Sequence, residues 1–119
     1  MAGYLVLLYV DEANLATNMP DDLLAAHGKF AAVHGEAIRG GGWLAPTSTA
    51  TSLRTVGDTP GYAPGAGAEA VDGPFVETKE ALAGYYLLEV DDLDAALAVA
   101  RDVPAPFGGV EVRPLIPTS

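Results

Sequence analysis

Two apolar runs, residues 4–10 (YLVLLYV) and residues 84–90 (GYYLLEV), constrain the fold of this chain most strongly. Successive side chains of a strand point to opposite faces of a sheet, so a run of this kind predicts a strand that is covered on both faces. Helices packed on one side of a sheet bury only one of these faces. A soluble monomer rarely leaves a large apolar patch in water, and the second face therefore predicts a homodimer packed sheet to sheet.

Two helices are expected between the strands. Residues 11–17 are typical of a turn, and residues 19–22 (MPDD) then begin a helix, with acidic side chains at its positive end. This helix is expected to end near Arg39, where glycines 40–42 stop it. A second helix is predicted after Asp92, because aspartate is a preferred cap of helix N-termini.

The remaining segments complete the predicted fold. Residues 43–56 predict a strand or a bent hairpin arm, residues 57–70 a loop rich in Gly, Pro and Ala, and residues 109–114 a last strand. The order is therefore β-α-β-β-α-β, which is typical of the ferredoxin-like α+β fold with an antiparallel sheet. A chain of this length is expected to form one such domain, over residues 1–119.

The charge and hydropathy of the chain limit its partners. The sequence has 16 Asp and Glu residues but only 6 Lys and Arg residues, which gives a formal net charge of −10. Such a chain repels the phosphate backbone of nucleic acids, so nucleic-acid binding is not expected. The apolar runs are too short to span a membrane, and no basic segment precedes the first of them, so a cytoplasmic protein without membrane contact is expected.

The first predicted helix carries both histidines of the chain, His27 and His34. At about 100° per residue they fall on one stripe of the helix, the stripe that faces the sheet. The apolar members of this stripe are Leu23, Phe30 and Ile38. A buried imidazole needs a hydrogen-bond partner. Each histidine is therefore either a structural residue at the edge of the core or a general acid or base whose ordinary pKa suits proton transfer.

Asp72 is the expected partner of His27. It precedes Gly73 and Pro74, and this type of turn exposes the carboxylate on a rigid elbow. An imidazole–carboxylate pair orients a histidine for proton transfer, so His27 and Asp72 are the candidate catalytic residues, with His34 as the alternative histidine. The structural interpretation of the same pattern is a turn aspartate that bonds only to its own backbone.

No metal or cofactor site is predicted. His27 and His34 are two helical turns apart, which is too far for one ordinary ion. The chain has no cysteine, which excludes disulfides and Cys-ligated metals. The glycines of residues 57–67 lack the flanking residues of a nucleotide-binding loop.

Four further residues are candidates for binding a small organic ligand. Arg54 and Lys79 are cations in a very acidic chain, and each is expected to pair with a carboxylate of the protein or of a ligand. Phe75 and Tyr85 are expected near the cleft, where one tyrosine hydroxyl reaches a polar group. Surface ion pairs, and packing of the aromatic rings in the core or the dimer interface, are the structural alternatives.

Residues 72–90 (DGPFVETKEALAGYYLLEV) resemble the DGPF-domain proteins of the YCII-related family. The name-giving DGPF sequence is followed, as in that family, by an E-T-K-E segment and a G-Y-Y strand. Residues 44–54 resemble the middle strand of these proteins, and residues 108–114 resemble their closing strand. The resemblance therefore covers nearly the whole chain.

The resemblance implies a dimeric α/β barrel of ferredoxin-like subunits with a His–Asp pair in a cleft. Asp72 matches the aspartate through its motif, whereas His27 is placed only by its early position in the helix. Related DGPF proteins often lie beside genes for extracytoplasmic-function sigma factors. The sequence thus predicts a small-molecule-binding cleft that uses His27 and Asp72 for proton transfer. The alternatives are a non-enzymatic ligand-binding or accessory module linked to such sigma factors, and an interaction protein built on the apolar sheet face.

Overall fold

The computed structural model describes residues 1–18, 22–55 and 68–117. The chain divides into a first unit, residues 1–44 with 79–119, and a second unit, residues 45–78. Each unit has a sheet of its own. The expectation of one domain over the whole chain stays a prediction.

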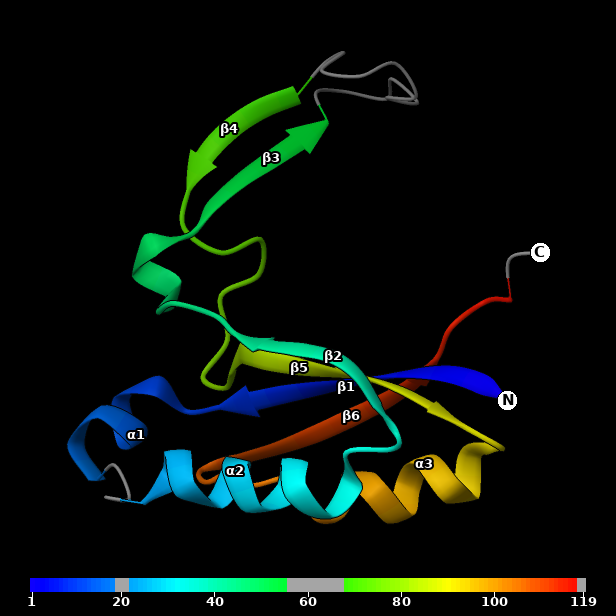
Figure 1. The fold of residues 1–119 in the computed structure, drawn as a ribbon. Coiled ribbons are helices and arrows are strands. Elements are labelled where there is room, and N and C mark those ends of the chain that lie inside the picture. Colours follow the sequence, from blue (N-terminus) through cyan, green and yellow to red (C-terminus); the bar gives the residue numbers. More distant parts are fainter. Residues whose placement is uncertain (19–21, 56–67, 118–119) are drawn as a thin grey trace. The chain divides into compact units, whose positions relative to one another are not determined.

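The first unit is built on a four-stranded antiparallel sheet (Figure 1). Its strands are, in spatial order, β2 (Ile38–Trp43), β5 (Ala81–Val90), β1 (Ala2–Val10) and β6 (Gly108–Pro114). Because β5 lies between β1 and β2 and is antiparallel to both, the connection from β1 to β2 is a split βαβ unit. The predicted ferredoxin-like α+β fold is confirmed.

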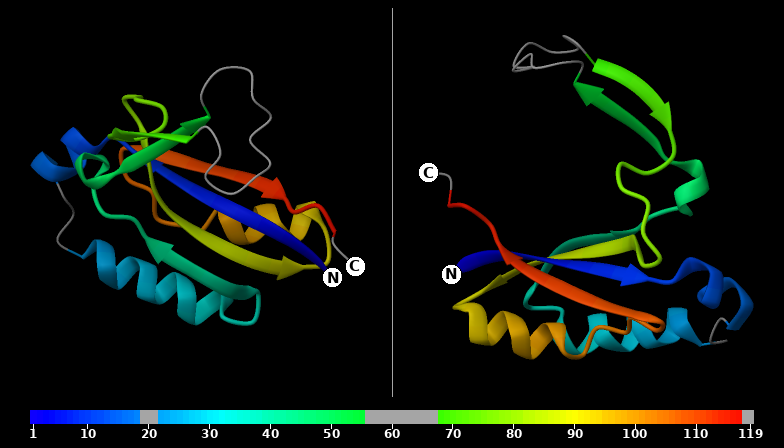
Figure 2. Two further views of the ribbon diagram at one scale, coloured as in Figure 1. Left: turned by 90° about the horizontal axis from the view of Figure 1, so that it is seen from above. Right: turned by 180° about the vertical axis from the view of Figure 1, so that it is seen from behind.

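Two helices lie on one face of this sheet, as Figures 1 and 2 show. They are α2 (Leu23–His34) and α3 (Leu93–Ala100). The carboxylate of Asp92 accepts a hydrogen bond of 2.9 Å from the backbone N–H of Ala95, so α3 begins with the predicted cap. None of the helices in the described part of the chain has the length and apolarity that a membrane span requires.

A short helix, α1 (Glu12–Asn18), occupies residues that the sequence pattern assigns to a turn. The prediction of a turn over residues 11–17 is therefore wrong. Asp11 explains the difference, because its carboxylate accepts hydrogen bonds from the backbone N–H and the side-chain amide of Asn14 and caps the first turn. The predicted helix start at residues 19–22 lies outside the described residues, apart from its last residue.

The core lies between the two helices and the sheet. Alternate residues of β1 are buried on the helix side: Tyr4, Val6, Leu8 and Val10. The side chains that complete the core come from β5, α2, α3 and the segment after α3: Leu88, Val90, Phe30, Ala96, Val99, Ala100 and Val103. Leu5, Leu7 and Tyr9 point to the opposite face and are only half-buried. The second apolar face expected from the sequence is thus present.

Glycines 40–42 lie inside a strand at the edge of the sheet, so the prediction that they end a helix is wrong. The helix ends at His34, and the three glycines belong to β2. Aromatic rings of β5 lie against two of them. A Cβ added to Gly41 would be 2.9 Å from the ring of Tyr86, and one added to Gly42 would be 3.4 Å from the ring of Tyr85. Glycine disfavours helix and strand alike, but here it leaves room for these rings.

The second unit contains a two-stranded antiparallel ribbon. It is formed by β3 (Thr51–Thr55) and β4 (Ala68–Asp72), and a 3₁₀ turn, η1 (Thr47–Thr49), precedes it. The strand expected over residues 43–56 is therefore interrupted by this turn. Of the loop expected over residues 57–70, the last three residues belong to β4 and the others lie outside the described residues.

Substitution of Gly41 tests the packing of the aromatic rings on β2. Gly41→Ala places a methyl group 2.9 Å from the ring of Tyr86 and from the backbone oxygen of Tyr85. We expect this variant to lose about 1–3 kcal/mol in the free energy of unfolding. Gly40→Ala is the matched control, because a Cβ there meets only Leu87, at 3.9 Å, and the variant should be neutral or stabilised. Urea unfolding measures both, and equal stabilities would contradict the expectation.

Candidate functional site

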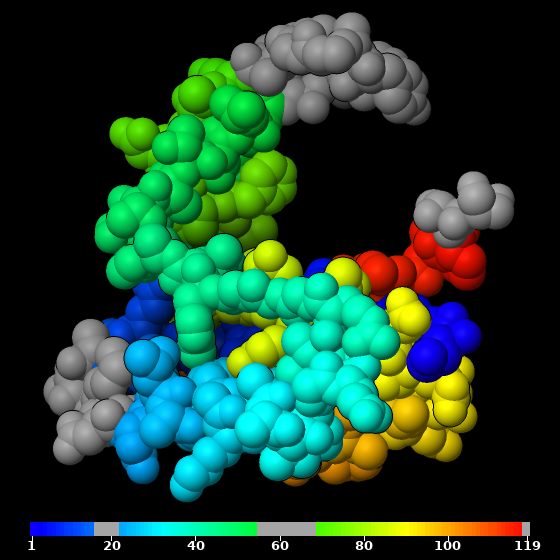
Figure 3. All heavy atoms as spheres, viewed as in Figure 1, coloured from blue at the N-terminus to red at the C-terminus, as the bar shows by residue number. Residues whose placement is uncertain are grey.

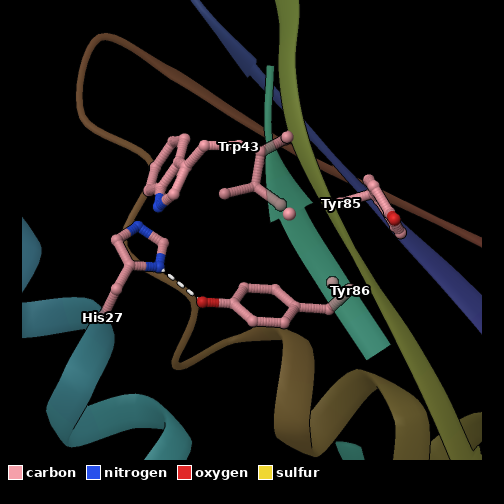
Figure 4. A pocket seen from close by; sticks show the side chains of 8 residues that line it. His27, Trp43, Tyr85 and Tyr86 are labelled. Atoms are coloured by element: carbon pink, nitrogen blue, oxygen red, sulfur yellow. Dashed lines mark hydrogen bonds between the residues drawn. The ribbon is translucent and has the colours of Figure 1, made fainter. Parts of the chain in front are cut away.

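A pocket of about 220 Å³ lies in the first unit between α2 and the edge of the sheet. It is lined by Leu8 of β1, His27 of α2, Gly41, Gly42 and Trp43 of β2, and Gly84, Tyr85 and Tyr86 of β5. Figure 3 shows the surface hollowed between α2 (cyan) and β2, and Figure 4 shows the labelled side chains. Among the described residues that line the pocket, none carries a carboxylate, ammonium or guanidinium group, and their polar groups are an imidazole, two phenols, an indole and the backbone.

His27 is held in this pocket by contacts from two strands, β5 and β2. Its side chain projects from α2, and the residue is only 5% exposed. Its Nδ1 and the hydroxyl of Tyr86 are joined by a hydrogen bond of 2.8 Å. The ring of Trp43 meets the imidazole edge to face, with the ring centroids 4.5 Å apart. Figure 4 shows the imidazole between the indole and the phenol. These contacts orient the ring.

The other ring nitrogen of His27 has no well-formed hydrogen bond, although the backbone carbonyl of Pro104 lies near enough to the ring to affect its pKa. Nε2 is buried and makes no hydrogen bond of good geometry to any described residue. A buried polar atom without a partner costs free energy, because it has lost its hydration without compensation. Because the atom is buried, a molecule in the pocket reaches it only if a neighbouring side chain moves.

Burial sets the ionisation of both members of the His27–Tyr86 pair. Desolvation lowers the pKa of His27 below its ordinary value, and the backbone carbonyl of Pro104 opposes this shift only in part. Desolvation also raises the pKa of Tyr86. Near pH 7 the pair therefore consists of a neutral imidazole and a neutral phenol.

His34, the alternative histidine, lies outside the pocket. Its Nε2 donates a hydrogen bond of 2.8 Å to the carboxylate of Asp102, which follows α3. The side chain of Asp102 is largely exposed, so this is a surface contact between α2 and the segment after α3. The structure thus separates the two histidines and places only His27 among the residues that line the pocket.

Three of the predicted site residues belong to the second unit. Arg54 donates a hydrogen bond of 2.5 Å to the backbone oxygen of Phe75, and its guanidinium carbon lies 4.0 Å from the centre of the Phe75 ring. These two candidate ligand-binding residues therefore contact one another in a cation–π pair. Asp72 is exposed at the end of β4, opposite Thr51. Its pairing with His27 stays a prediction.

The elbow after Asp72 has the backbone geometry expected of it. Gly73 has a φ of 101°, a conformation that favours glycine. The backbone N–H of Gly73 donates to the oxygen of Ala50, and the hydroxyl of Ser52 donates to the oxygen of Gly73. The turn is therefore fixed by hydrogen bonds within the second unit.

The remaining candidates, Tyr85 and Lys79, belong to the first unit. Tyr85 contributes to the pocket lining, but its ring points to the opposite face of the sheet from that of Tyr86 (Figure 4). It is 39% exposed. Lys79 is exposed and does not line the pocket. In the part of the chain that the structure describes, no group of three or more His, Asp or Glu side chains gathers closely enough to hold a metal ion.

Comparison with known proteins identifies the family of this chain. The family model of the YCII-related domain matches residues 2–119. The chain belongs to the YCII-related family. An uncharacterised protein of Rhizobium meliloti (strain 1021) is similar to it, with 35% identity over 121 residues that cover 94% of this chain and 90% of that protein. The recognition of this family in residues 72–90 is confirmed.

Two pocket residues of this YCII-related protein escape prediction from the sequence. Trp43 follows three glycines, which favour the end of a helix when they are considered alone. Tyr86 stands among apolar neighbours, and only a general expectation that a tyrosine hydroxyl reaches the cleft applies to it. The signal that could predict them is a run of glycines in one segment and adjacent aromatic residues in another, because an aromatic ring can pack over a glycine of the neighbouring strand.

The lowered pKa of His27 predicts how stability depends on pH. In the unfolded chain His27 has its ordinary pKa of 6.5, whereas its pKa in the folded protein is lower. As the pH falls, the unfolded chain therefore binds a proton at this residue before the folded protein does. The free energy of unfolding should therefore fall as the pH drops from about 7.5 to about 5.5. His27→Gln should show a smaller fall than the wild type, because it removes the buried titrating group. Urea unfolding across this range measures the slopes, and a wild-type slope in His27→Gln would contradict the assignment.

Proposed function

We propose that this YCII-related protein binds a small organic molecule in the pocket beside His27 and transfers a proton to or from it. The observation that carries the proposal is the position of His27, whose imidazole lines the pocket and is oriented by the hydroxyl of Tyr86 and the ring of Trp43. A neutral imidazole is suited to the task because it both accepts and donates protons.

The size and lining of the pocket limit the ligand. Its volume of about 220 Å³ is below the range of about 300–1,000 Å³ that drug-sized ligands occupy. The lining consists mainly of aromatic rings and glycine backbone. A molecule with one small ring or a short chain suits these dimensions.

A panel of small ketones, phenols and carboxylic acids tests binding. Trp43 is the only tryptophan of the chain, so its fluorescence reports on the pocket directly. We expect at least one class of probe to change this fluorescence, His27→Gln to weaken the response, and His34→Gln to preserve it. Failure of every probe to alter the fluorescence would contradict the proposal.

Proton transfer is followed in deuterated buffer by proton NMR. Exchange of the C–H hydrogens next to the carbonyl of a bound ketone should be faster with wild type, and His27→Gln should slow it by about 10²- to 10⁴-fold. Asp72→Asn tests the predicted second acid–base group, and a comparable loss would support the pair. Binding without any exchange would instead favour a non-enzymatic ligand-binding module.

We also propose that two copies of the chain pair through the open face of the four-stranded sheet. Half-buried or exposed apolar side chains line the centre of this face: Leu5, Leu7, Tyr9, Tyr85 and Leu87. Such a contiguous face is unusual on a monomer. Its residues recur on both copies of a two-fold dimer, which makes a self-complementary interface.

Substitution on this face tests the homodimer. Leu7→Glu places a charge at its centre and should shift the wild-type dimer to monomer in analytical ultracentrifugation, because burial of an unpaired charge is costly. Leu24→Glu is the matched control, since Leu24 is strongly exposed on α2. A monomeric wild type would rule out the interface.

A further inference from the structure

Both ring nitrogens of His27 face the protein rather than the pocket. Nδ1 and the hydroxyl of Tyr86 are joined by the hydrogen bond of 2.8 Å. Nε2 is buried, and the backbone carbonyl of Pro104 lies near enough to the ring to affect its pKa. A molecule in the pocket therefore meets neither nitrogen while these contacts hold. A proton that travels between the ligand and His27 has to pass through a group that contacts the imidazole.

Tyr86 is the group in a position to carry that proton. The titratable side chains among the described residues of the pocket lining are His27, Tyr85 and Tyr86. The ring of Tyr85 points to the opposite face of the sheet (Figure 4). Tyr86 lines the pocket, is only partly buried, and is bonded to His27 through its hydroxyl. The ring of Phe30 packs against it, with the ring centroids 4.8 Å apart.

The two neighbours of the imidazole favour the same tautomer. The carbonyl of Pro104 can only accept a hydrogen bond, so it favours a proton on Nε2. A phenol is a much stronger acid than the N–H of a neutral imidazole, so the hydroxyl of Tyr86 donates and Nδ1 of His27 accepts across their contact. Nδ1 thus directs a lone pair at the hydroxyl and is able to take up its proton.

We propose that Tyr86 is the catalytic residue that exchanges a proton with the ligand, and that His27 acts behind it as the proton acceptor. A C–H bond next to a ligand carbonyl breaks, and its proton passes to the phenol oxygen of Tyr86. The phenol O–H proton passes at the same time to Nδ1 of His27. The products are the enolate of the ligand, a neutral tyrosine and an imidazolium, and the reverse transfers restore the starting state. The proposal rests on the proposed function, because it names the route of the proton in the same pocket.

The surroundings of the pair suit such a relay. Burial lowers the pKa of His27, and the carbonyl of Pro104 opposes this effect because it accepts from the Nε2–H that the imidazolium retains. Burial also raises the pKa of Tyr86, which disfavours a phenolate. The relay forms no phenolate, since Tyr86 gives up one proton as it receives another. The positive charge is placed on His27, next to the carbonyl that stabilises it.

Tyr86→Phe separates the relay from direct action of His27. The substitution removes the hydroxyl and frees Nδ1, so an imidazole that acts directly would keep or gain activity. The relay predicts instead that exchange of the ketone C–H hydrogens in deuterated buffer slows about 10²- to 10⁴-fold, as in His27→Gln. The double variant should be no slower than either single variant, because the two residues act as a unit.

Two further measurements exclude a merely structural effect of Tyr86→Phe. Binding of the ketone, followed by Trp43 fluorescence, should change far less than the exchange rate, because the aromatic ring remains in place. Tyr9→Phe is the matched control, since Tyr9 lies on the open face of the sheet and does not line the pocket. This control should exchange the ketone hydrogens at the wild-type rate.

Chemical modification of the wild type tests the geometry without a ligand and without any variant. N-acetylimidazole acetylates accessible tyrosine hydroxyls, diethyl pyrocarbonate modifies accessible histidine nitrogens, and mass spectrometry of peptides locates both products. We expect Tyr86 to be acetylated in the native protein and His27 to be modified no faster than the protein unfolds. His34, which is partly exposed, is the reference histidine. Rapid modification of His27, or acetylation of Tyr86 only on unfolding, would overturn the relay.

The outcomes separate the relay from the proposed function. Exchange by the wild type that survives in Tyr86→Phe would refute the relay and leave His27 as the direct acid or base. Absence of exchange by the wild type with every ketone of the panel would refute the proposed proton transfer, and the relay with it.

Discussion

The close approach of β5 aromatic rings to the glycines of β2 is the constraint on which the site depends. The ring of Tyr86 lies where a side chain at Gly41 would otherwise be, and this position brings its hydroxyl to within 2.8 Å of His27. The same relation holds in the other direction, because the indole of Trp43 on β2 packs over Gly84 of β5, where an added Cβ would be 3.3 Å from the ring. Two strands thus exchange small and large residues, and a helix supplies the imidazole that both aromatic residues contact.

The electrostatics of the site follow from this packing. The rings that fix His27 also exclude water from it, and desolvation is the dominant cause of its lowered pKa. A surface histidine shows the contrast, since His34 pairs with the exposed carboxylate of Asp102. The same residue type on the same stripe of one helix therefore has two roles, determined by which element packs over it.

The sequence predicts the fold and the buried histidine for identifiable physical reasons. The two apolar runs define the central strands, and the helical period places His27 on the inward stripe of α2. The local sequence does not predict that glycines 40–42 belong to a strand, because three glycines after a helical pattern usually indicate the end of the helix. Their position in β2 depends instead on the rings of Tyr85 and Tyr86, which are distant in the sequence. The partner of His27 is equally hidden, since Tyr86 is 59 residues away and its direction depends on the register of β5. The expected partner, Asp72, is a prediction from a motif rather than from a contact.

The glycine-rich edge strand has a consequence for self-association. In the sheet order of the described residues β2 is terminal, so one side of its backbone has no partner strand within that sheet. Proteins commonly protect such edges with charged or bulky side chains. Gly41 is closed to this solution, because the ring of Tyr86 occupies the space that a side chain needs. Arg39 is the one charged side chain that the strand offers against edge-to-edge pairing.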